Sequence, residues 1–218
     1  MTTTSPTLGK PSATDSGIRT VFAKALATGT EVVAGVRPDQ LDDPTPCPDY
    51  DVRTLLGHLV NVLDRVTLMG RGEDPFTVPD IVGGLADDAW LPAWSDAAQR
   101  LVEAWADDAA LVRTVRLPWA EDSGAVTLAS YCNEITVHTW DLATATGQRP
   151  EWDAEVVATA WDAIQRMPGK GRAEMFAGFK AGMPEPYRSR SDPWVDAVPV
   201  PDDASPIDRL VAWNGRRP

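Results

Sequence analysis

Hydrophobic residues recur at intervals of three and four along several segments of this chain, which is the spacing of an amphipathic helix. The first such segment covers residues 14–36, where Thr14 or Asp15 is a candidate N-cap. The second follows the N-cap candidate Asp51 and reaches Met69, before Gly70. Its apolar stripe consists of Val52, Leu55, Leu56, Leu59, Val62, Leu63, Val66 and Met69. We therefore predict helices over 14–36 and 51–69, joined by a loop rich in proline.

The same pattern predicts further helices over about 92–112, 127–147 and 153–167. Thr127 is the expected N-cap of the middle helix, and Gly147 the glycine just beyond its last turn. Residues 113–124 allow a short strand or an extended connection. The chain closes with a short helix that starts at Ser205 and stops before Gly215.

Four long amphipathic helices with longish connections predict an all-α protein built on a helix bundle. We expect residues 1–13 to form a flexible leader and residues 14–147 to form the bundle. Residues 148–218 add a fifth helix and a Pro-rich tail packed on the same domain. From Met183 onward the frequent prolines predict mostly irregular structure.

The charge of the chain limits its partners. It holds 32 acidic and 20 basic residues, a formal net charge of −12. Nucleic acids and anionic membranes select basic surfaces, so we expect neither as a partner. No apolar run approaches the roughly 18 residues of a membrane span, and residues 1–13 lack the apolar core of a signal peptide. The two cysteines, Cys47 and Cys132, form no CxxC pair, which suits a reducing compartment. These features predict a cytoplasmic protein.

The chain has two histidines, and each falls at the edge of a predicted apolar stripe. His58 flanks the stripe of the 51–69 helix. Glu134, His138 and Asp141 share one flank of the 127–147 helix, because residues three and four apart lie on adjacent turns. A carboxylate beside a hydrophobic face is costly unless it is paired or bound to a cation. The pattern is consistent with a metal site of His58, Glu134 and His138, a ligand set that suits Zn²⁺ but also Fe²⁺, Ni²⁺ or Mn²⁺.

Simpler interpretations fit the same residues. Glu134 and His138 can form an ordinary pair on the helix surface, and His58 can be a satisfied histidine at the core edge. Arg65 lies on the flank of His58, where it is a candidate to bind an anionic substrate or cofactor, although a solvated or salt-bridged arginine fits equally. Cys47 can be a fourth ligand, a redox thiol or a small packed residue.

Two motifs carry a resemblance to a known family. TPCPDYDVRTLLGHLV (45–60) and NEITVHTWDLATATG (133–147) resemble the two signatures of the DinB-like four-helix-bundle superfamily. More narrowly, they are similar to its branch related to the N-terminal domain of mycothiol-dependent maleylpyruvate isomerase. The terminal SPIDRLVAWNGRRP resembles the end of compact metal-binding members of that branch. The resemblance implies a DinB-like four-helix bundle, here with a C-terminal α-helical and Pro-rich extension.

The resemblance also implies chemistry. By position, His58, Glu134 and His138 would bind a divalent metal, usually zinc. Family members of known activity join or isomerise small electrophiles with a low-molecular-weight thiol such as mycothiol, whose sulfur coordinates the metal. Asp141 would orient His138 or the bound groups, or handle a proton in catalysis. A homodimer formed through bundle faces is a further expectation.

Three functions follow as hypotheses. The first is a metal-dependent, thiol-dependent S-transferase or isomerase that acts on a small electrophile. The second is a metal-dependent hydrolase that needs no thiol. The third is a non-enzymatic protein that binds a metal or a small ligand.

Overall fold

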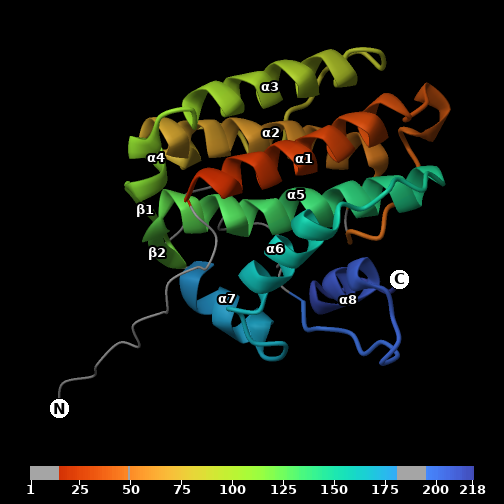
Figure 1. The fold of residues 1–218 in the computed structure, drawn as a ribbon. Helices are drawn as coiled ribbons and strands as arrows, with labels where there is room; N and C mark the ends of the chain where they lie inside the picture. The colour runs from red at the N-terminus through yellow and green to blue at the C-terminus, as the bar shows by residue number, and fades with distance from the viewer. Residues whose placement is uncertain (1–14, 49, 181–194) are drawn as a thin grey trace.

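The computed structural model describes residues 15–48, 50–180 and 195–218, and within them lie eight α-helices and one two-stranded sheet. The predicted leader (1–13) and residues 183–194 of the predicted tail lie outside the described residues. Four long helices run side by side: α1 (Asp15–Ala34), α2 (Val52–Arg71), α3 (Trp90–Ala104) and α5 (Gly124–Thr146), as Figure 1 shows. The predicted all-α fold is confirmed.

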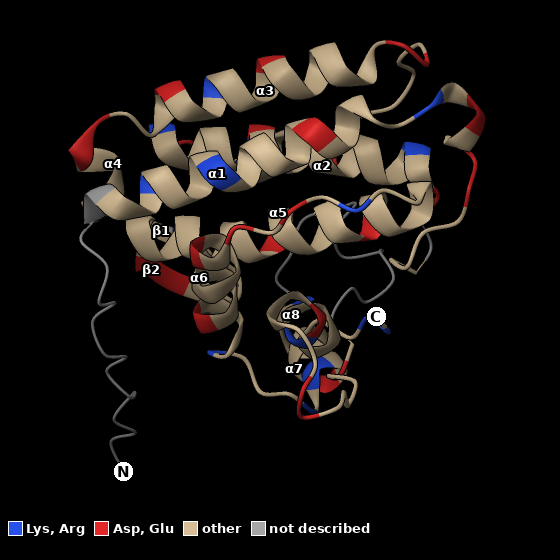
Figure 2. Ribbon diagram, turned by 45° about the vertical axis from the view of Figure 1, so that its right-hand side comes forward, with Lys and Arg blue, Asp and Glu red and all other residues tan. Residues whose placement is uncertain are grey.

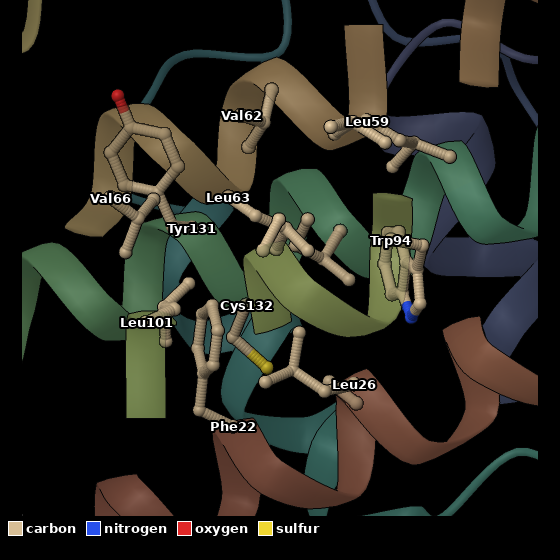
Figure 3. Close-up of a cluster of buried hydrophobic side chains, with 14 of the residues drawn as sticks. Phe22, Leu26, Leu59, Val62, Leu63, Val66, Trp94, Leu101, Tyr131 and Cys132 are labelled. Carbon is tan, nitrogen blue, oxygen red and sulfur yellow. The ribbon is translucent and has the colours of Figure 1, made fainter. Parts of the chain in front are cut away.

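The core lies between these four helices. Figure 3 shows Phe22 of α1, Leu59 of α2, Trp94 of α3 and Cys132 of α5 converging in one cluster. Every residue of the stripe predicted on α2 is buried. Burying an aliphatic side chain of this size stabilises a fold by about 1.5–3 kcal/mol, so the packing of α2 explains why its sequence pattern is so regular.

The remaining elements are short. They are the 3-10 turns η1 (Pro38–Gln40) and η2 (Pro75–Thr77), α4 (Asp108–Val112), β1 (Thr114–Leu117), β2 (Ala120–Ser123), α6 (Ala154–Ile164), α7 (Arg172–Lys180) and α8 (Pro206–Trp213). Strands β1 and β2 form an antiparallel hairpin that pairs Thr114 with Ser123. The alternative of a short strand in residues 113–124 is therefore the correct one. Helices α6, α7 and α8 lie on the side of α5 that is turned away from α3 (Figure 1).

The sequence predicted that the second helix ends at Met69, before Gly70, and this prediction is wrong. The helix continues through Gly70 to Arg71, and Gly72 caps it in the left-handed conformation with φ 76°. Gly70 serves packing instead, because a Cβ there would lie 2.7 Å from Nε1 of Trp105. That indole donates a hydrogen bond to the carbonyl of Val66 at 2.9 Å. A glycine inside a helix can thus mark a close neighbour rather than an end.

The predicted helix over 92–112 is in fact two helices. Helix α3 ends at Ala104, and Trp105 leaves the helical conformation with φ −102° and ψ 8°. Asp107 then caps α4 by accepting a hydrogen bond from the amide of Ala109 at 2.9 Å. Burial of Trp105 against α2 therefore interrupts a pattern that reads as continuous in the sequence.

Other boundaries also differ from the prediction. Ser123, not Thr127, caps α5, and the Thr127 hydroxyl donates to the carbonyl of Ser123 at 3.0 Å. Helix α6 ends at Ile164 rather than near Met167. Helix α7 was not predicted from the sequence. Two predicted helix ends are confirmed. Gly147 ends α5 with φ 71°, and Ser205 caps the start of α8.

The surface agrees with the acidic composition. Figure 2 shows Asp and Glu on α3, α4, α6 and β2, with basic positions interspersed. No helix among the described residues has both the length and the apolar character that a membrane crossing requires.

Candidate metal centre

Local structure fixes the first histidine in place. Asp51 caps α2 by accepting a hydrogen bond from the amide of Thr54 at 2.7 Å, which sets where the helix begins. The neighbouring loop lies close against Gly57, whose carbonyl accepts a hydrogen bond from the amide of Val82 at 3.1 Å. A Cβ at Gly57 would lie 2.1 Å from the carbonyl oxygen of Val82. The next residue, His58, is 4% exposed and points toward α5.

Helix α5 supplies two further donor groups beside His58. The Oε1 atom of Glu134 lies 3.3 Å from Nε2 of His58 and 3.5 Å from Nε2 of His138. The two imidazole rings meet edge to face, with centroids 4.8 Å apart. One ligand atom from each of the three residues lies within 4.8 Å of the other two. The predicted set His58, Glu134 and His138 is thus brought together by two helices.

The donor set and its spacing fit a divalent cation. Zn–N and Zn–O bonds of about 2.0–2.1 Å in a tetrahedral arrangement place neighbouring ligand atoms roughly 3.3 Å apart. The two measured separations from Glu134 Oε1, 3.3 and 3.5 Å, are of that size. Two imidazoles and one carboxylate are also a ligand set that leaves a coordination position open. The same donors accommodate other divalent metals, so they do not identify the metal.

A buried ion pair holds the ring of His138. Its Nδ1 lies 3.0 Å from Oδ2 of Asp141, whose side chain is fully buried. Arg216 completes the arrangement, because its Nε and Nη2 donate to Asp141 at 3.1 and 2.8 Å. Hydrogen bonding of the far ring nitrogen to a carboxylate is the usual way in which a metal-binding histidine is oriented. The contact turns Nε2 of His138 toward Glu134.

His58 is held differently. Its ring packs between Tyr50, at a centroid distance of 5.4 Å, and His138. Its Nδ1 is buried and has no hydrogen-bond partner among the described residues. Ring packing therefore takes the place of a carboxylate on this side of the site.

The three side chains have opposed titration behaviour. Burial lowers the pKa of His58 to about 4, although Glu134 acts in the opposite direction. Burial also disfavours the charged form of His138, but the charge of Glu134 and the hydrogen bond to Asp141 raise its pKa well above 6.5. Burial likewise opposes ionisation of Glu134, yet His138 and His58 hold its pKa well below 4.5. In the metal-free protein at neutral pH these directions favour a charged His138 and Glu134 and a neutral His58.

The cluster opens into a cavity of about 460 Å³. Its walls come from the loop before α2, the β hairpin, α5, the end of α6, α7 and the C-terminal segment. Volumes of roughly 300–1,000 Å³ are typical of sites for small molecules. Glu134 keeps 38% of its side chain exposed, so the donor cluster is accessible from this space.

Arg65 also lines the cavity, as expected from its place on α2. Its Nη2 lies 3.4 Å from Oδ1 of Asp80, and both side chains are at most 10% exposed. The arginine is thus salt-bridged, which was one of the two alternatives at the sequence level. A role in binding an anionic ligand stays a prediction.

The C-terminal segment contributes residues to the site that were not predicted from the sequence. Arg216 binds Asp141, and Asn214 forms two hydrogen bonds with Asn133, at 2.9 and 3.2 Å, beside Glu134. These contacts join positions that are 75 and 81 residues apart. The signals in the sequence were the polar ending NGRR after a short amphipathic helix and the resemblance of this terminal segment to that of compact metal-binding family members. No periodicity could relate it to α5.

Comparisons with known proteins agree with the fold. A family model described as the mycothiol maleylpyruvate isomerase N-terminal domain matches residues 22–143. The uncharacterised proteins MT0763 and Rv0738, from the CDC 1551 / Oshkosh and ATCC 25618 / H37Rv strains of Mycobacterium tuberculosis, are each 31% identical over 186 residues. Each of these matches covers 85% of this chain and 90% of the relative.

Two solved structures share the architecture. They are crystal structures of the mycothiol-dependent maleylpyruvate isomerase and of a histidine-to-alanine mutant of it, with TM-scores of 0.59 and 0.55. Each match is 12% identical in sequence and covers 75% of this chain and 72% of the other. At that identity the likeness concerns the fold alone.

Proposed function

Since this chain belongs to the mycothiol maleylpyruvate isomerase N-terminal domain family, we propose that it binds a divalent metal and catalyses a thiol-dependent reaction of a small electrophile. The reaction would be an S-transfer or an isomerisation, with mycothiol as the thiol. The observation that carries the proposal is the gathering of His58, Glu134 and His138 within 4.8 Å at the wall of a 460 Å³ cavity.

The metal would be held by His58 and His138 through Nε2 and by Glu134 through its carboxylate. A bound divalent cation supplies Lewis acidity and lowers the pKa of a thiol that coordinates it. Zinc suits the donor set, and nickel, iron or manganese fit the same ligands.

The chain's own residues would prepare this site. Asp141 holds Nδ1 of His138, so that Nε2 presents its lone pair to the cation. Because Asp141 is fully buried, we assign it a positioning role through His138 rather than contact with the substrate. Arg216 keeps Asp141 ionised, and the hydrogen bond from His138 and the charge of Arg216 lower the pKa of this buried carboxyl.

The remaining cavity wall would bind the electrophile and exclude water from it. Leu117 and Trp119 of the hairpin and Met175 of α7 give this wall an apolar character. Exclusion of water protects a reactive thiolate and strengthens electrostatic interactions within the site. Arg65, at the α2 wall, is the candidate contact for an anionic group on the substrate.

Two measurements test the proposal. Protein purified without chelators should contain about one divalent metal per chain by elemental analysis, because His58, Glu134 and His138 would hold one cation. The metal-loaded protein should then either consume mycothiol in the presence of 1-chloro-2,4-dinitrobenzene, which would be S-transfer, or isomerise maleylpyruvate only when mycothiol is present and without net consumption of the thiol. Glu134→Gln should lose both metal and activity, whereas Glu155→Gln, which removes a surface carboxylate paired with Lys24, should keep both.

The outcomes separate the three hypotheses. Turnover that persists without thiol would favour a hydrolase, and stoichiometric metal binding without any turnover would favour a binding protein. Absence of metal at His58, Glu134 and His138 would refute the proposed centre itself.

A further inference from the structure

Among the described residues, four arginines line the cavity, and three of them are paired with a carboxylate. The pairs are Arg65 with Asp80, Arg166 with Asp122 and Arg216 with Asp141, at 3.4, 3.0 and 2.8 Å. The fourth, Arg172, is the first residue of α7 and is only 3% exposed. Within the described part of the chain, its side chain hydrogen-bonds to backbone carbonyls and not to a carboxylate. A buried arginine without such a partner is unusual.

The hydrogen bonds of Arg172 leave two of its donors unused. A guanidinium carries five N–H donors. Nε donates to the carbonyl of Pro168 at 2.6 Å, and Nη1 donates to the carbonyls of Val195, at 3.3 Å, and Trp213. Nη2 is buried and has no hydrogen-bond partner among the described residues. Because a buried charged donor without an acceptor is costly, this nitrogen is suited to an acceptor that enters from the cavity.

Packing holds the guanidinium in one position. Its Cζ lies 5.6 Å from the ring centroid of Trp213, and the Trp213 ring meets that of Trp161 edge to face at 5.6 Å. The nearby acid Asp196 accepts a hydrogen bond from the backbone amide of Arg172 at 3.0 Å. A group that is already fixed loses little conformational freedom when a ligand binds. The donors on Nη2 are therefore preorganised for an anion.

The cavity wall that continues from Arg172 is apolar. Met175 and Phe176 follow it on α7 and also line the cavity. Phe176 packs with Phe76 and Trp119, whose rings meet edge to face at 6.2 Å. Apolar walls with a few fixed polar groups are typical of sites for small organic molecules. One arginine with unused donors beside aromatic side chains suits a flat apolar molecule that carries a single carboxylate.

The C-terminal segment connects Arg172 with the candidate metal centre. The carbonyl of Trp213 accepts a hydrogen bond from Arg172. Three positions further, Arg216 pairs with Asp141, which holds the ring of His138. Arg172 and His138 line the same 460 Å³ cavity. An acid bound at Arg172 therefore extends into the space that the metal centre faces.

We propose that Arg172 binds the carboxylate of a small aromatic or unsaturated monocarboxylic acid through the donors on Nη2. This acid is the electrophile, and its reacting carbon lies on the side of the cavity that holds His58, Glu134 and His138. Only the identification of the acid as the electrophile rests on the proposed function. Arg172 thereby determines specificity for acidic over neutral molecules of the same shape.

The test measures binding of 4-nitrobenzoate and of its neutral analogue 4-nitrobenzamide to the full-length protein by calorimetry, without thiol. The wild type should bind the acid at least about tenfold more tightly than the amide, because the acid forms a charge-assisted hydrogen bond. In Arg172→Gln the two affinities should lie within about threefold of each other. Disturbed packing alone would weaken both ligands alike and leave their ratio unchanged. Arg172→Lys, which keeps the charge, should keep a preference of at least about threefold.

Two further variants serve as controls. Arg116→Gln makes the same change in an exposed arginine that pairs with Glu121 outside the cavity lining, and it should bind like the wild type. Glu134→Gln, which should lack the metal, should keep the preference for the acid, because Arg172 and not the metal binds the carboxylate.

Four results would overturn the proposal. They are equal binding of acid and amide by the wild type, a preference that survives in Arg172→Gln, loss of the preference in Glu134→Gln, and loss of the preference in Arg65→Gln, which would assign the carboxylate to Arg65 instead. The measurement involves neither thiol nor turnover. Its failure and the failure of the proposed reaction are therefore distinguishable.

Discussion

Replacing Asp141 by Asn tests whether the buried ion pair orients His138. In the wild type, Asp141 is fully buried, lies 3.0 Å from Nδ1 of His138 and accepts hydrogen bonds from Arg216 at 3.1 and 2.8 Å. Asparagine keeps the shape but removes the charge. The guanidinium of Arg216 then stays buried without its counter-charge, which costs about 3–5 kcal/mol of folding free energy.

Metal affinity should fall as well. Loss of a carboxylate partner of a metal-bound histidine typically costs about 10- to 100-fold in affinity, or roughly 1.4–2.8 kcal/mol. Urea unfolding of the metal-free protein measures the first effect, and competition for Zn²⁺ against a chelating indicator measures the second.

Asp64→Asn is the matched control. It makes the same chemical change in an ion pair with Arg100, where the aspartate side chain is 28% exposed. Partly exposed pairs contribute about 0–1 kcal/mol, and this pair lies outside the cavity lining. Stability should change by no more than that amount, and Zn²⁺ affinity should be unaffected.

A double variant separates orientation from stability. Adding Arg216→Met to Asp141→Asn removes both buried charges, so stability should largely recover, whereas Zn²⁺ affinity should stay low. If Asp141→Asn bound Zn²⁺ within about twofold of the wild type, the proposed orienting role of Asp141 would be refuted.

Three further outcomes are expected. His138→Ala should abolish metal binding. The circular dichroism signal of the helices should largely persist, because the core between α1, α2, α3 and α5 does not depend on this residue. Loss of the helical signal would instead mean that the metal is structural. Metal binding at pH 7 should release about one proton, because the raised pKa of His138 keeps it protonated in the metal-free protein, and affinity should therefore weaken as the pH falls. Calorimetry in buffers of different ionisation enthalpy measures this release, and absence of any release would contradict the assignment of the proton. Gly57→Ala should destabilise the protein by about 1–3 kcal/mol in urea unfolding, since the new Cβ would lie 2.1 Å from the carbonyl oxygen of Val82, whereas Gly178→Ala, with no atom within 4 Å of the new Cβ, should not destabilise it.

The helices were predictable where a single local pattern decided them. The buried stripe of α2, the N-caps Asp51 and Ser205, and the terminal Gly147 depend on residues within a few positions of each other. The ends that were wrong depend on distant partners. Gly70 stays helical because Trp105 packs on it, and α3 stops early because Trp105 turns toward α2.

Within the chain itself, the sequence determined which residues share a helix face. Glu134, His138 and Asp141 adjoin one another because α5 is a regular helix, and the only other histidine had to come from another segment. The tertiary structure decided that His58 lies 3.3 Å from Glu134, that Arg216 neutralises Asp141, and that Cys47 adjoins His138. Helical periodicity relates positions three or four apart, whereas contacts between positions 75 or more apart arise only when the helices pack around a common core.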